Sequence, residues 1–215
     1  MRTTRAVYDA KATETVSAAQ AARIARESGY ESTDDDLLGV SCGNPVAIAQ
    51  LQPGETVVDL GAGAGFDVFL AASKVGHGFA IGLDGSAAMI DRARTAATRR
   101  KHSPPHVAFA QAELGKALPL QDGSVDLFIS NCVINLLEDA EKATLFCELF
   151  RCLKPGGRVA ISDILARRDL PPEIQNNLAA KAACIGGAVT PDRQHALLQD
   201  AGFESALSCE PHLTL

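Results

Sequence analysis

An acid followed by a glycine-rich turn is the first stretch of this 215-residue chain whose residue types and spacing suggest chemistry. Residues 57–65 read VVDLGAGAG, so Asp59 ends an apolar run and is followed by Gly61, Gly63 and Gly65. Glycines at such a turn permit positive φ angles and let a ligand approach the backbone closely. The spacing differs from the dinucleotide fingerprint G-x-G-x-x-G, because position 66 is Phe. The pattern predicts a nucleoside-type ligand at the end of a strand, with a purely structural turn as the alternative.

A second acid, Asp84, ends the next apolar run, residues 79–84. A carboxylate there can accept hydrogen bonds from both hydroxyls of a ribose, although a helix-capping role is the alternative. Met89 follows in the next helix and is expected either against an adenine face or in the core. The other candidate binding residues lie in the same turn or follow later strands: Ala62, Asp67, Gly85, Glu113, Leu114 and Asn131.

Alternating strand-like and helix-like segments must position these residues. Strands are expected at 56–60, 79–84, 107–110, 124–130 and 158–163, and helices at 66–75, 86–100, 138–153, 171–183 and 191–201. The alternation predicts an α/β fold of Rossmann-like type, with a mostly parallel sheet flanked by helices. Residues 154–157, KPGG, are expected to form the turn between a helix and the fifth strand, and Gly202-Phe203 to begin a last strand.

The N-terminal part is expected to be an extension of the sheet domain. Residues 1–12 look irregular, residues 14–28 helical and residues 34–38 like a short helical turn, and Asn44-Pro45 should open a helix to about Leu51. We expect residues 1–52 to form a helical cap over the ligand mouth. Residues 53–215 should be a single globular unit.

Composition excludes several classes of protein. The net charge of −6 argues against a general binder of nucleic acid or of anionic membranes. No apolar run approaches the ~18 residues of a membrane helix, and no signal peptide is recognisable at the start. A cytoplasmic protein is therefore expected, with its six cysteines as reduced thiols. The five histidines show no zinc-binding spacing.

Four features in this order resemble class I S-adenosylmethionine-dependent methyltransferases. They are the acid with its glycine turn, Asp84, the segment Ser130-Asn131-Cys132 after the fourth strand, and LKPGG at 153–157. The resemblance implies a class I methyltransferase domain over residues 53–215, with S-adenosylmethionine as cofactor. It places Asn131 and Cys132 beside the methyl donor. Tyr8 is a further candidate to approach the sulfonium cation, with ordinary packing as the alternative.

Three segments resemble a narrower family, the arsenite methyltransferases. They read GVSCGNP at 39–45, ISNCVINL at 129–136 and CIGGA at 184–188. The resemblance implies that Cys132 and Cys184 hold trivalent arsenic and that Cys42 is a third thiolate. Arsenic(III) is soft and favours sulfur ligands, whereas three buried core cysteines are the alternative. Cys147 and Cys152 are not expected to be ligands, because residues five apart on a helix point to different faces, and no role is assigned to Cys209.

The resemblance implies an arsenic(III) methyltransferase that acts on thiolate-bound arsenite, methylarsenite or both in arsenic detoxification. A thiol reductant of the glutathione or thioredoxin type would be its co-substrate. Two alternatives remain open at this point. One is a class I methyltransferase of a small organic substrate, and the other is a non-catalytic arsenic-binding protein of the same fold. The number of methyl groups added and the oligomeric state are left open.

Overall fold

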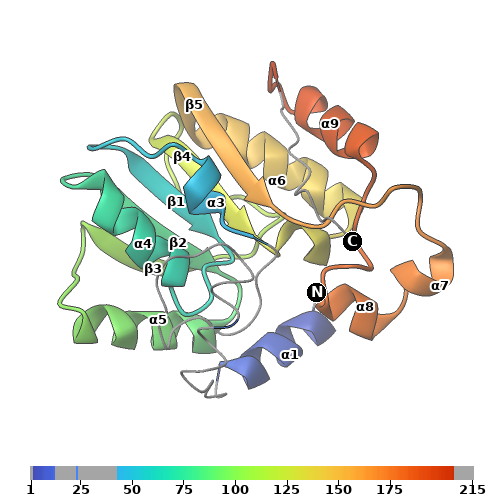
Figure 1. Ribbon diagram of the computed structural model, residues 1–215, viewed down its shortest axis with the longest axis horizontal. Coiled ribbons are helices and arrows are strands. Elements are labelled where there is room, and N and C mark those ends of the chain that lie inside the picture. The colour runs from blue at the N-terminus through green and yellow to red at the C-terminus, as the bar shows by residue number, and fades with distance from the viewer. Residues whose placement is uncertain (1, 13–22, 24–42, 206–215) are drawn as a thin grey trace.

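A five-stranded parallel sheet forms the centre of the protein. The structure is a computed structural model that describes residues 2–12, 23 and 43–205. The strands stand in the order β3-β2-β1-β4-β5, and every neighbouring pair is parallel (Figure 1). Their bounds are β1 Thr56–Leu60, β2 Phe79–Asp84, β3 Val107–Gln111, β4 Val125–Asn131 and β5 Leu153–Ser162. The predicted α/β fold of Rossmann-like type is confirmed.

The register brings the chemically interesting strand ends to one edge. Leu60 of β1 pairs with Leu83 of β2 and with Ser130 of β4, so these three strands end together. Parallel sheets are covered on both faces, and the apolar runs at β1 and β4 are accordingly buried almost throughout. The residues that follow these strands therefore meet at the carboxyl edge of the sheet.

Helices cover both faces and confirm most of the expected segments. Helices α3 (Pro45–Ile48), α4 (Phe66–Val75) and α5 (Ala87–Arg99) pack in one core cluster. Helices α6 (Asp139–Cys152) and α9 (Pro191–Asp200) pack in the other. Ser86 caps α5, because its Oγ accepts a hydrogen bond from the N–H of Met89 at 3.1 Å. No helix among the described segments combines the length and apolar composition that crossing a membrane requires.

The N-terminal segment differs from the expectation. Residues 1–12 were predicted to be irregular, but α1 is a helix over Arg2–Lys11. It packs against α5 and α8 (Leu178–Ala182), and Arg92 Nη1 on α5 donates to the Ala12 carbonyl at 2.8 Å. Docking of this kind stabilises a short helix that local sequence alone does not. Figure 1 shows α1 and α8 next to each other, beyond the carboxyl ends of the strands.

Other expectations in this region have mixed outcomes. The helix at 14–28 and the turn at 34–38 lie outside the described residues. Helix α3 begins at Pro45 as predicted but ends at Ile48 instead of near Leu51. Gln50 has a φ of 49°, which lies outside the right-handed helical region, so the helix cannot extend through it. Val46 and Ala49 belong to the core beside α4, so this part of the expected cap packs as part of the sheet domain. The boundary at residue 52 stays a prediction.

Three expectations in the C-terminal half were wrong. Residues 154–157 are not a separate turn: β5 starts at Leu153, and an irregularity in its pairing with β4 accommodates them. The single helix expected at 171–183 is two short helices, α7 (Pro172–Gln175) and α8, because the Asn177 side chain caps a new helix at Ala180 N, 3.0 Å away. Residues 202–205 form a turn and a bend instead of starting a strand.

Candidate functional site

The glycine turn between β1 and α4 lies against the end of β2. The N–H groups of Gly61 and Ala62 both donate to the Leu83 carbonyl, at 2.7 and 3.0 Å. Gly61 has a φ of 72°, and a Cβ at this position would lie 2.2 Å from Cγ2 of Val133, so only glycine fits. Gly63 differs, because a Cβ there would meet nothing within 4 Å. The turn is therefore packed on the Gly61 side and open at Gly63.

Asp84 faces this open turn. Its Oδ2 accepts a hydrogen bond from the N–H of Gly63 at 2.9 Å, and its Oδ1 accepts one from the N–H of Ser86 at 2.8 Å. The carboxylate is thus fixed by two backbone donors that come from different loops. The Ser86 hydroxyl also hydrogen-bonds the carboxylate of Asp9, which brings α1 to the same place.

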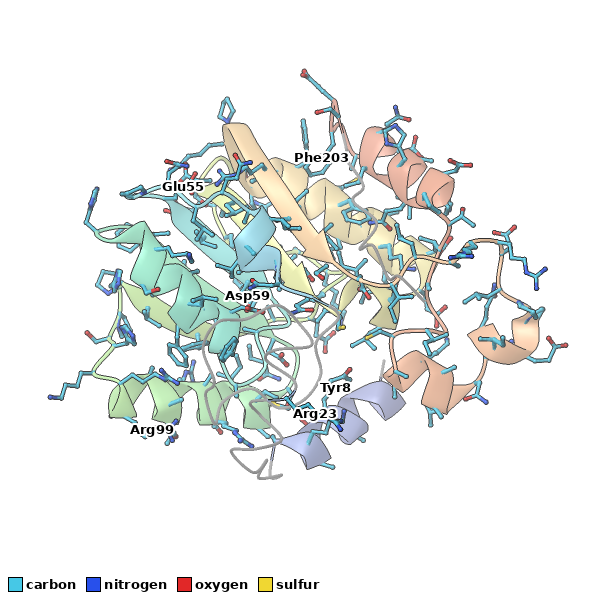
Figure 2. The ribbon with its side chains drawn as sticks, viewed as in Figure 1. Tyr8, Arg23, Glu55, Asp59, Arg99 and Phe203 are labelled. Atoms are coloured by element: carbon cyan, nitrogen blue, oxygen red, sulfur yellow. The ribbon has the colours of Figure 1, made fainter. Side chains whose placement is uncertain are left out.

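Two further acids lie behind the turn. Asp59 is 3% exposed, and burial, followed by the negative charges of Asp67 and Asp84, raises its pKa well above the usual range. Asp67 is also buried, and its carboxylate lies 3.4 Å from the side-chain nitrogen of Asn131, which also donates to the Gly43 carbonyl at 2.9 Å. Asp59, labelled in Figure 2, lies near the middle of the sheet. A ligand that carries positive charge would favour the ionised forms of these acids.

The remaining predicted cofactor residues are spread around this turn. Met89 is buried with 3% exposure, so both adenine contact and core packing remain compatible with its position. Gly85 lies between Asp84 and Ser86, and its carbonyl accepts from the side chain of Gln111 at 3.0 Å. Ala62 and Leu114 are buried, and the half-buried Glu113 pairs with Lys116. Their roles as cofactor contacts stay predictions.

Two of the three predicted thiols come together at the carboxyl edge, although 52 residues separate them. Cys132 directly follows β4, and its N–H donates to the Ser162 carbonyl at 2.9 Å. Cys184 follows α8, and its Sγ lies 2.8 Å from the Cys132 carbonyl oxygen. Both residues are buried, and both have a left-handed backbone, with φ of 57° and 59°. Such a conformation is rare for residues with a Cβ and concentrates at functional sites.

An aspartate completes this cluster. One ligand atom each from Cys132, Asp163 and Cys184 lie within 4.8 Å of one another. Burial raises the pKa of the Cys184 thiol to about 12, and the negative charge of Asp163 adds to that shift. Cys132 is disulfide-bonded, whereas the sequence analysis predicted reduced thiols. In its reduced form the cluster offers two sulfur atoms and one carboxylate.

Tyr8 approaches the thiol side of the site. Its hydroxyl hydrogen-bonds Cys184 and lies 3.4 Å from the Ala182 carbonyl. Burial raises the pKa of this phenol, with the Cys184 charge as the next cause. The Lys11 ammonium lies 5.6 Å from the centre of the Tyr8 ring. Tyr8 is labelled on α1 in Figure 2, and contact with a sulfonium cation stays a prediction.

The sequence analysis did not assign a role to three residues that support the cluster. Asp163 follows β5, and Asn135 donates to it from its backbone N–H at 3.1 Å and from its side chain at 2.9 Å. Lys142 is 1% exposed and donates to the Gly187 carbonyl, three residues after Cys184. The position of Asp163 at the end of a parallel strand is a signal that could have identified it. Nothing in the local sequence indicates that Asn135 and Lys142 turn inward.

The other cysteines have different surroundings. Cys42 lies outside the described residues, so the third predicted thiolate stays a prediction. Cys147 is exposed on α6. Cys152 is buried at the opposite edge of the sheet from Cys132, because its carbonyl accepts from Ser124 at the start of β4. Neither thiol belongs to the cluster of Cys132, Asp163 and Cys184 among the described residues, and the absence of a ligand role for them stays a prediction.

Comparison with known proteins identifies relatives of the same kind. A family model described as "Methyltransferase domain" matches residues 51–202. An arsenite methyltransferase from Halobacterium salinarum is 47% identical over 169 residues, which are 78% of this chain and 42% of that protein. An arsenite methyltransferase from Mus musculus is 31% identical over 164 residues, 73% of this chain and 42% of that one. The chain thus spans well under half the length of these relatives.

Solved structures show the same architecture. An arsenic(III) S-adenosylmethionine methyltransferase from Chlamydomonas reinhardtii superposes with a TM-score of 0.67 at 35% identity, over 77% of this chain and 56% of that chain. A complex of the Haloferax volcanii Trm112 activator with a methyltransferase matches 91% of this chain and 75% of that chain, with a TM-score of 0.63. At 22% identity this second likeness concerns the fold alone.

Proposed function

Because the chain belongs to the methyltransferase-domain family, we propose that it transfers methyl groups from S-adenosylmethionine to trivalent arsenic held by Cys132 and Cys184. The observation that carries the proposal is the meeting of these two cysteines at the carboxyl edge, both in the left-handed backbone region. Gln50 and Lys101 share this backbone region, so the conformation supports the proposal only together with the contact between the two cysteines. Arsenite and methylarsenite are the proposed substrates, and detoxification is the proposed role. The likeness to arsenite methyltransferases over more than 70% of this chain supports the arsenic chemistry.

The glycine turn and the acids around it fit the proposed cofactor. S-adenosylmethionine carries a ribose, a sulfonium cation and an ammonium group, and it supplies an electrophilic methyl group when bound. Asp84 would accept from the ribose hydroxyls, since it faces the open side of Gly63. Asp59 and Asp67 lie buried behind the turn, where a cationic part of the ligand would favour their charged forms. The full proposed set is Asp59, Gly61, Ala62, Gly63, Asp67, Asp84, Gly85, Met89, Glu113, Leu114 and Asn131.

The thiols bind arsenic as thiolates. Soft arsenic(III) prefers sulfur ligands, and each Cys–S–As bond forms as a thiol loses its proton and an arsenic-bound hydroxyl leaves as water. Burial raises the pKa of the Cys184 thiol, so the thiol holds its proton near neutral pH before arsenic binds. Cys42 is proposed as the third thiolate, needed for arsenite more than for methylarsenite, which has one exchangeable ligand fewer.

A reducing partner is part of the proposal. Cys132 must be released from its disulfide before its sulfur can bind arsenic. A thiol reductant of the glutathione or thioredoxin type would do this and would keep the arsenic trivalent between turnovers. Such reductants are maintained in the cytoplasm, which is the proposed location. A nucleic-acid or membrane partner is not proposed, given the net charge of −6.

Catalysis would come mainly from positioning. The arsenic lone pair is the nucleophile and carries no proton, so no general base is required for the transfer itself. The two fixed thiolates would hold the lone pair towards the glycine turn, on the neighbouring strand ends. Placing two reactants ~3–3.5 Å apart in the correct orientation is a large part of many rate accelerations.

The test is a turnover assay on the reduced protein with labelled S-adenosylmethionine and either arsenite or methylarsenite. Arsenic-dependent formation of methylated arsenic is the expected result. Cofactor consumption with small organic acids but not with arsenic would favour an organic-substrate methyltransferase. Tight arsenite binding without any cofactor consumption would favour a non-catalytic arsenic-binding protein.

A further inference from the structure

The charge next to the thiols is opposite to what arsenic binding alone requires. Asp163 places a carboxylate within 4.8 Å of the sulfur atoms of Cys132 and Cys184. Two thiolates beside a carboxylate would repel it and each other. Burial is the main reason that the pKa of Cys184 is raised, and the negative charge of Asp163 adds to the rise while Lys11 opposes it. A site selected only to bind arsenic through thiolates would gain from a neutral or positive neighbour instead.

The carboxylate is held in place from several directions. Asn135 donates to it through its backbone N–H at 3.1 Å and its side-chain amide at 2.9 Å, and the N–H of Ile164 donates at 3.0 Å. The Asn135 amide also donates to the Ile164 carbonyl at 2.7 Å, so it cannot rotate freely. Hydrogen bonds from N–H groups favour the charged form of a carboxyl, which opposes the rise in pKa caused by burial. Burial raises the pKa of Asp163 despite these hydrogen bonds and the nearby Lys142, and the carboxyl group is fixed in orientation beside the two sulfur atoms.

The positive charge moves during the proposed reaction. A bond forms between arsenic and the methyl carbon, using the arsenic lone pair. The bond between that carbon and the sulfonium sulfur breaks, and its electron pair stays on the sulfur, which becomes a neutral thioether. The positive charge is thereby transferred to arsenic, which was neutral before the step.

We propose that the carboxylate of Asp163 stabilises the positive charge that develops on thiolate-bound arsenic during methyl transfer. The inference rests on the proposed function and deepens it. Because arsenic would be bonded to both sulfur atoms of the cluster, its developing charge arises beside the carboxylate. Before transfer the positive charge lies on the sulfonium and the arsenic beside the carboxylate is neutral, so the carboxylate stabilises the transition state more than the ground state. A preorganised charge of this kind needs no rearrangement as the reaction proceeds.

The experiment uses the Asp163→Asn variant, which keeps the shape and removes the charge. Single-turnover methylation is measured on the reduced full chain with arsenite prebound, and arsenite affinity is measured separately by equilibrium dialysis with elemental analysis. The methyl-transfer rate should fall by about 10- to 100-fold. Arsenite affinity should stay the same or increase, because a repulsive charge has gone. Asp169→Asn is the matched control, since it removes an exposed charge six residues along the same segment.

The two readouts separate the possible roles. An unchanged rate in Asp163→Asn would overturn the proposal, as would a parallel loss of rate and arsenite affinity, which indicates a structural role. If Asp163→Asn does not fold, Asn135→Ala keeps the charge but frees the carboxylate. Its rate must then fall at unchanged arsenite affinity, and a wild-type rate would overturn the proposal. Failure of the proposed function is recognised independently, because the wild-type protein would then transfer no methyl group to arsenic.

Discussion

The two halves of the site are built in opposite ways. The proposed cofactor half is local: the glycine turn, Asp84 and Ser86 are joined by hydrogen bonds of backbone N–H groups across adjacent strand ends. The thiol half is assembled from the ends of β4, β5 and α8, which lie far apart in the sequence. Its two cysteines have strained backbones, whereas the strained positions of the cofactor half are glycines. At the glycine turn the backbone itself would contact the proposed ligand, so glycine can occupy the positions with positive φ. At the cluster the proposed function needs a sulfur atom, so cysteine occupies such positions despite the conformational free energy that a Cβ costs there.

The largest expected effect comes from removing either sulfur. Cys132→Ser and Cys184→Ser should each abolish methylation of arsenite and methylarsenite, because a hard hydroxyl does not replace a soft thiolate. S-adenosylmethionine affinity, measured by calorimetry, should be unchanged if the halves are as separate as they look. Cys147→Ser is the control, since that thiol is exposed on α6. Wild-type turnover in Cys132→Ser or Cys184→Ser would contradict the proposal that both sulfur atoms bind arsenic.

Cys42→Ser tests whether arsenite needs a third thiolate in addition to Cys132 and Cys184. A third thiolate matters more for arsenite, with three exchangeable ligands, than for methylarsenite, with two. We expect a much larger loss of arsenite turnover than of methylarsenite turnover, determined by product speciation under reducing conditions. Equal losses would exclude a third-ligand role for Cys42 and would leave the pair of Cys132 and Cys184 intact.

Two glycines separate packing from ligand contact within the cofactor half. Gly61→Ala should lower the unfolding free energy by about 1–3 kcal/mol, because its new Cβ meets Val133 and its φ is unfavourable. The Cβ of Gly63→Ala would make no such contact, so this variant should lower the unfolding free energy by only about 1 kcal/mol, because of its positive φ. Chemical denaturation measures the difference. A Gly63→Ala protein as unstable as Gly61→Ala would mean that the turn is not open at Gly63.

Asp84→Ala should weaken cofactor binding by about 10- to 100-fold, the effect of losing hydrogen bonds to a charged acceptor worth about 1.5–3 kcal/mol. Calorimetry with S-adenosylmethionine measures it, and exposed Asp91→Asn on α5 is a suitable control. Arsenite affinity should not change. Unchanged cofactor affinity in Asp84→Ala would remove this residue from the site.

The buried Cys184 thiol should make stability depend on pH at the alkaline end. Its pKa rises from an ordinary 9.0 to about 12 on folding, so the folded state holds the proton more tightly. The associated stability is complete below the lower value and is lost as the pH rises through the higher one, at about 1.4 kcal/mol per pH unit in between. Urea unfolding across this range should show that loss in the wild type and a smaller one in Cys184→Ser. Identical pH profiles would mean that the thiol is not buried in solution.

The smallest expected effect is that of Tyr8→Phe. The variant loses the hydroxyl that hydrogen-bonds Cys184 but keeps the ring beside Lys11. Stability should fall by about 0.5–1.5 kcal/mol, and arsenite binding should change more than cofactor binding. A change confined to cofactor affinity would instead assign the Tyr8 hydroxyl to the cofactor half, whereas the ring contact predicted from the sequence is kept in this variant.

Local rules explain what the sequence could predict. The strands, α4, α5 and the cap at Ser86 follow from apolar periodicity and from residues whose side chains bond their own backbone. The shared edge of the glycine turn and Asp84 follows from the parallel order of β1 and β2. These features depend on neighbours in sequence or on adjacent strands, so a single chain is enough to infer them.

Contacts between distant segments explain what the sequence could not predict. Helix α1 is stabilised by docking on α5 and α8, and its own residues gave no clear helical signal. The inward Lys142 and Asn135 depend on a loop that arrives more than 40 residues later, where a Cβ on Gly187 would lie 2.1 Å from the Asn135 carbonyl oxygen. The pairing of Cys132 with Cys184 came from family resemblance, since their spacing alone does not determine a contact.

The left-handed backbones of Cys132 and Cys184 also bear on how this chain can change over evolutionary time. At both positions glycine is conformationally better than any residue with a Cβ, by roughly 1 kcal/mol or more. Cysteine therefore persists there only while selection for its sulfur outweighs that difference. If the proposed function holds and arsenic exposure ceased, mutation to glycine at these two codons would remove the backbone cost but would also remove the contacts of a buried side chain. A descendant with glycine at both positions and an intact glycine turn would be expected to keep the cofactor and to have exchanged arsenic for another acceptor.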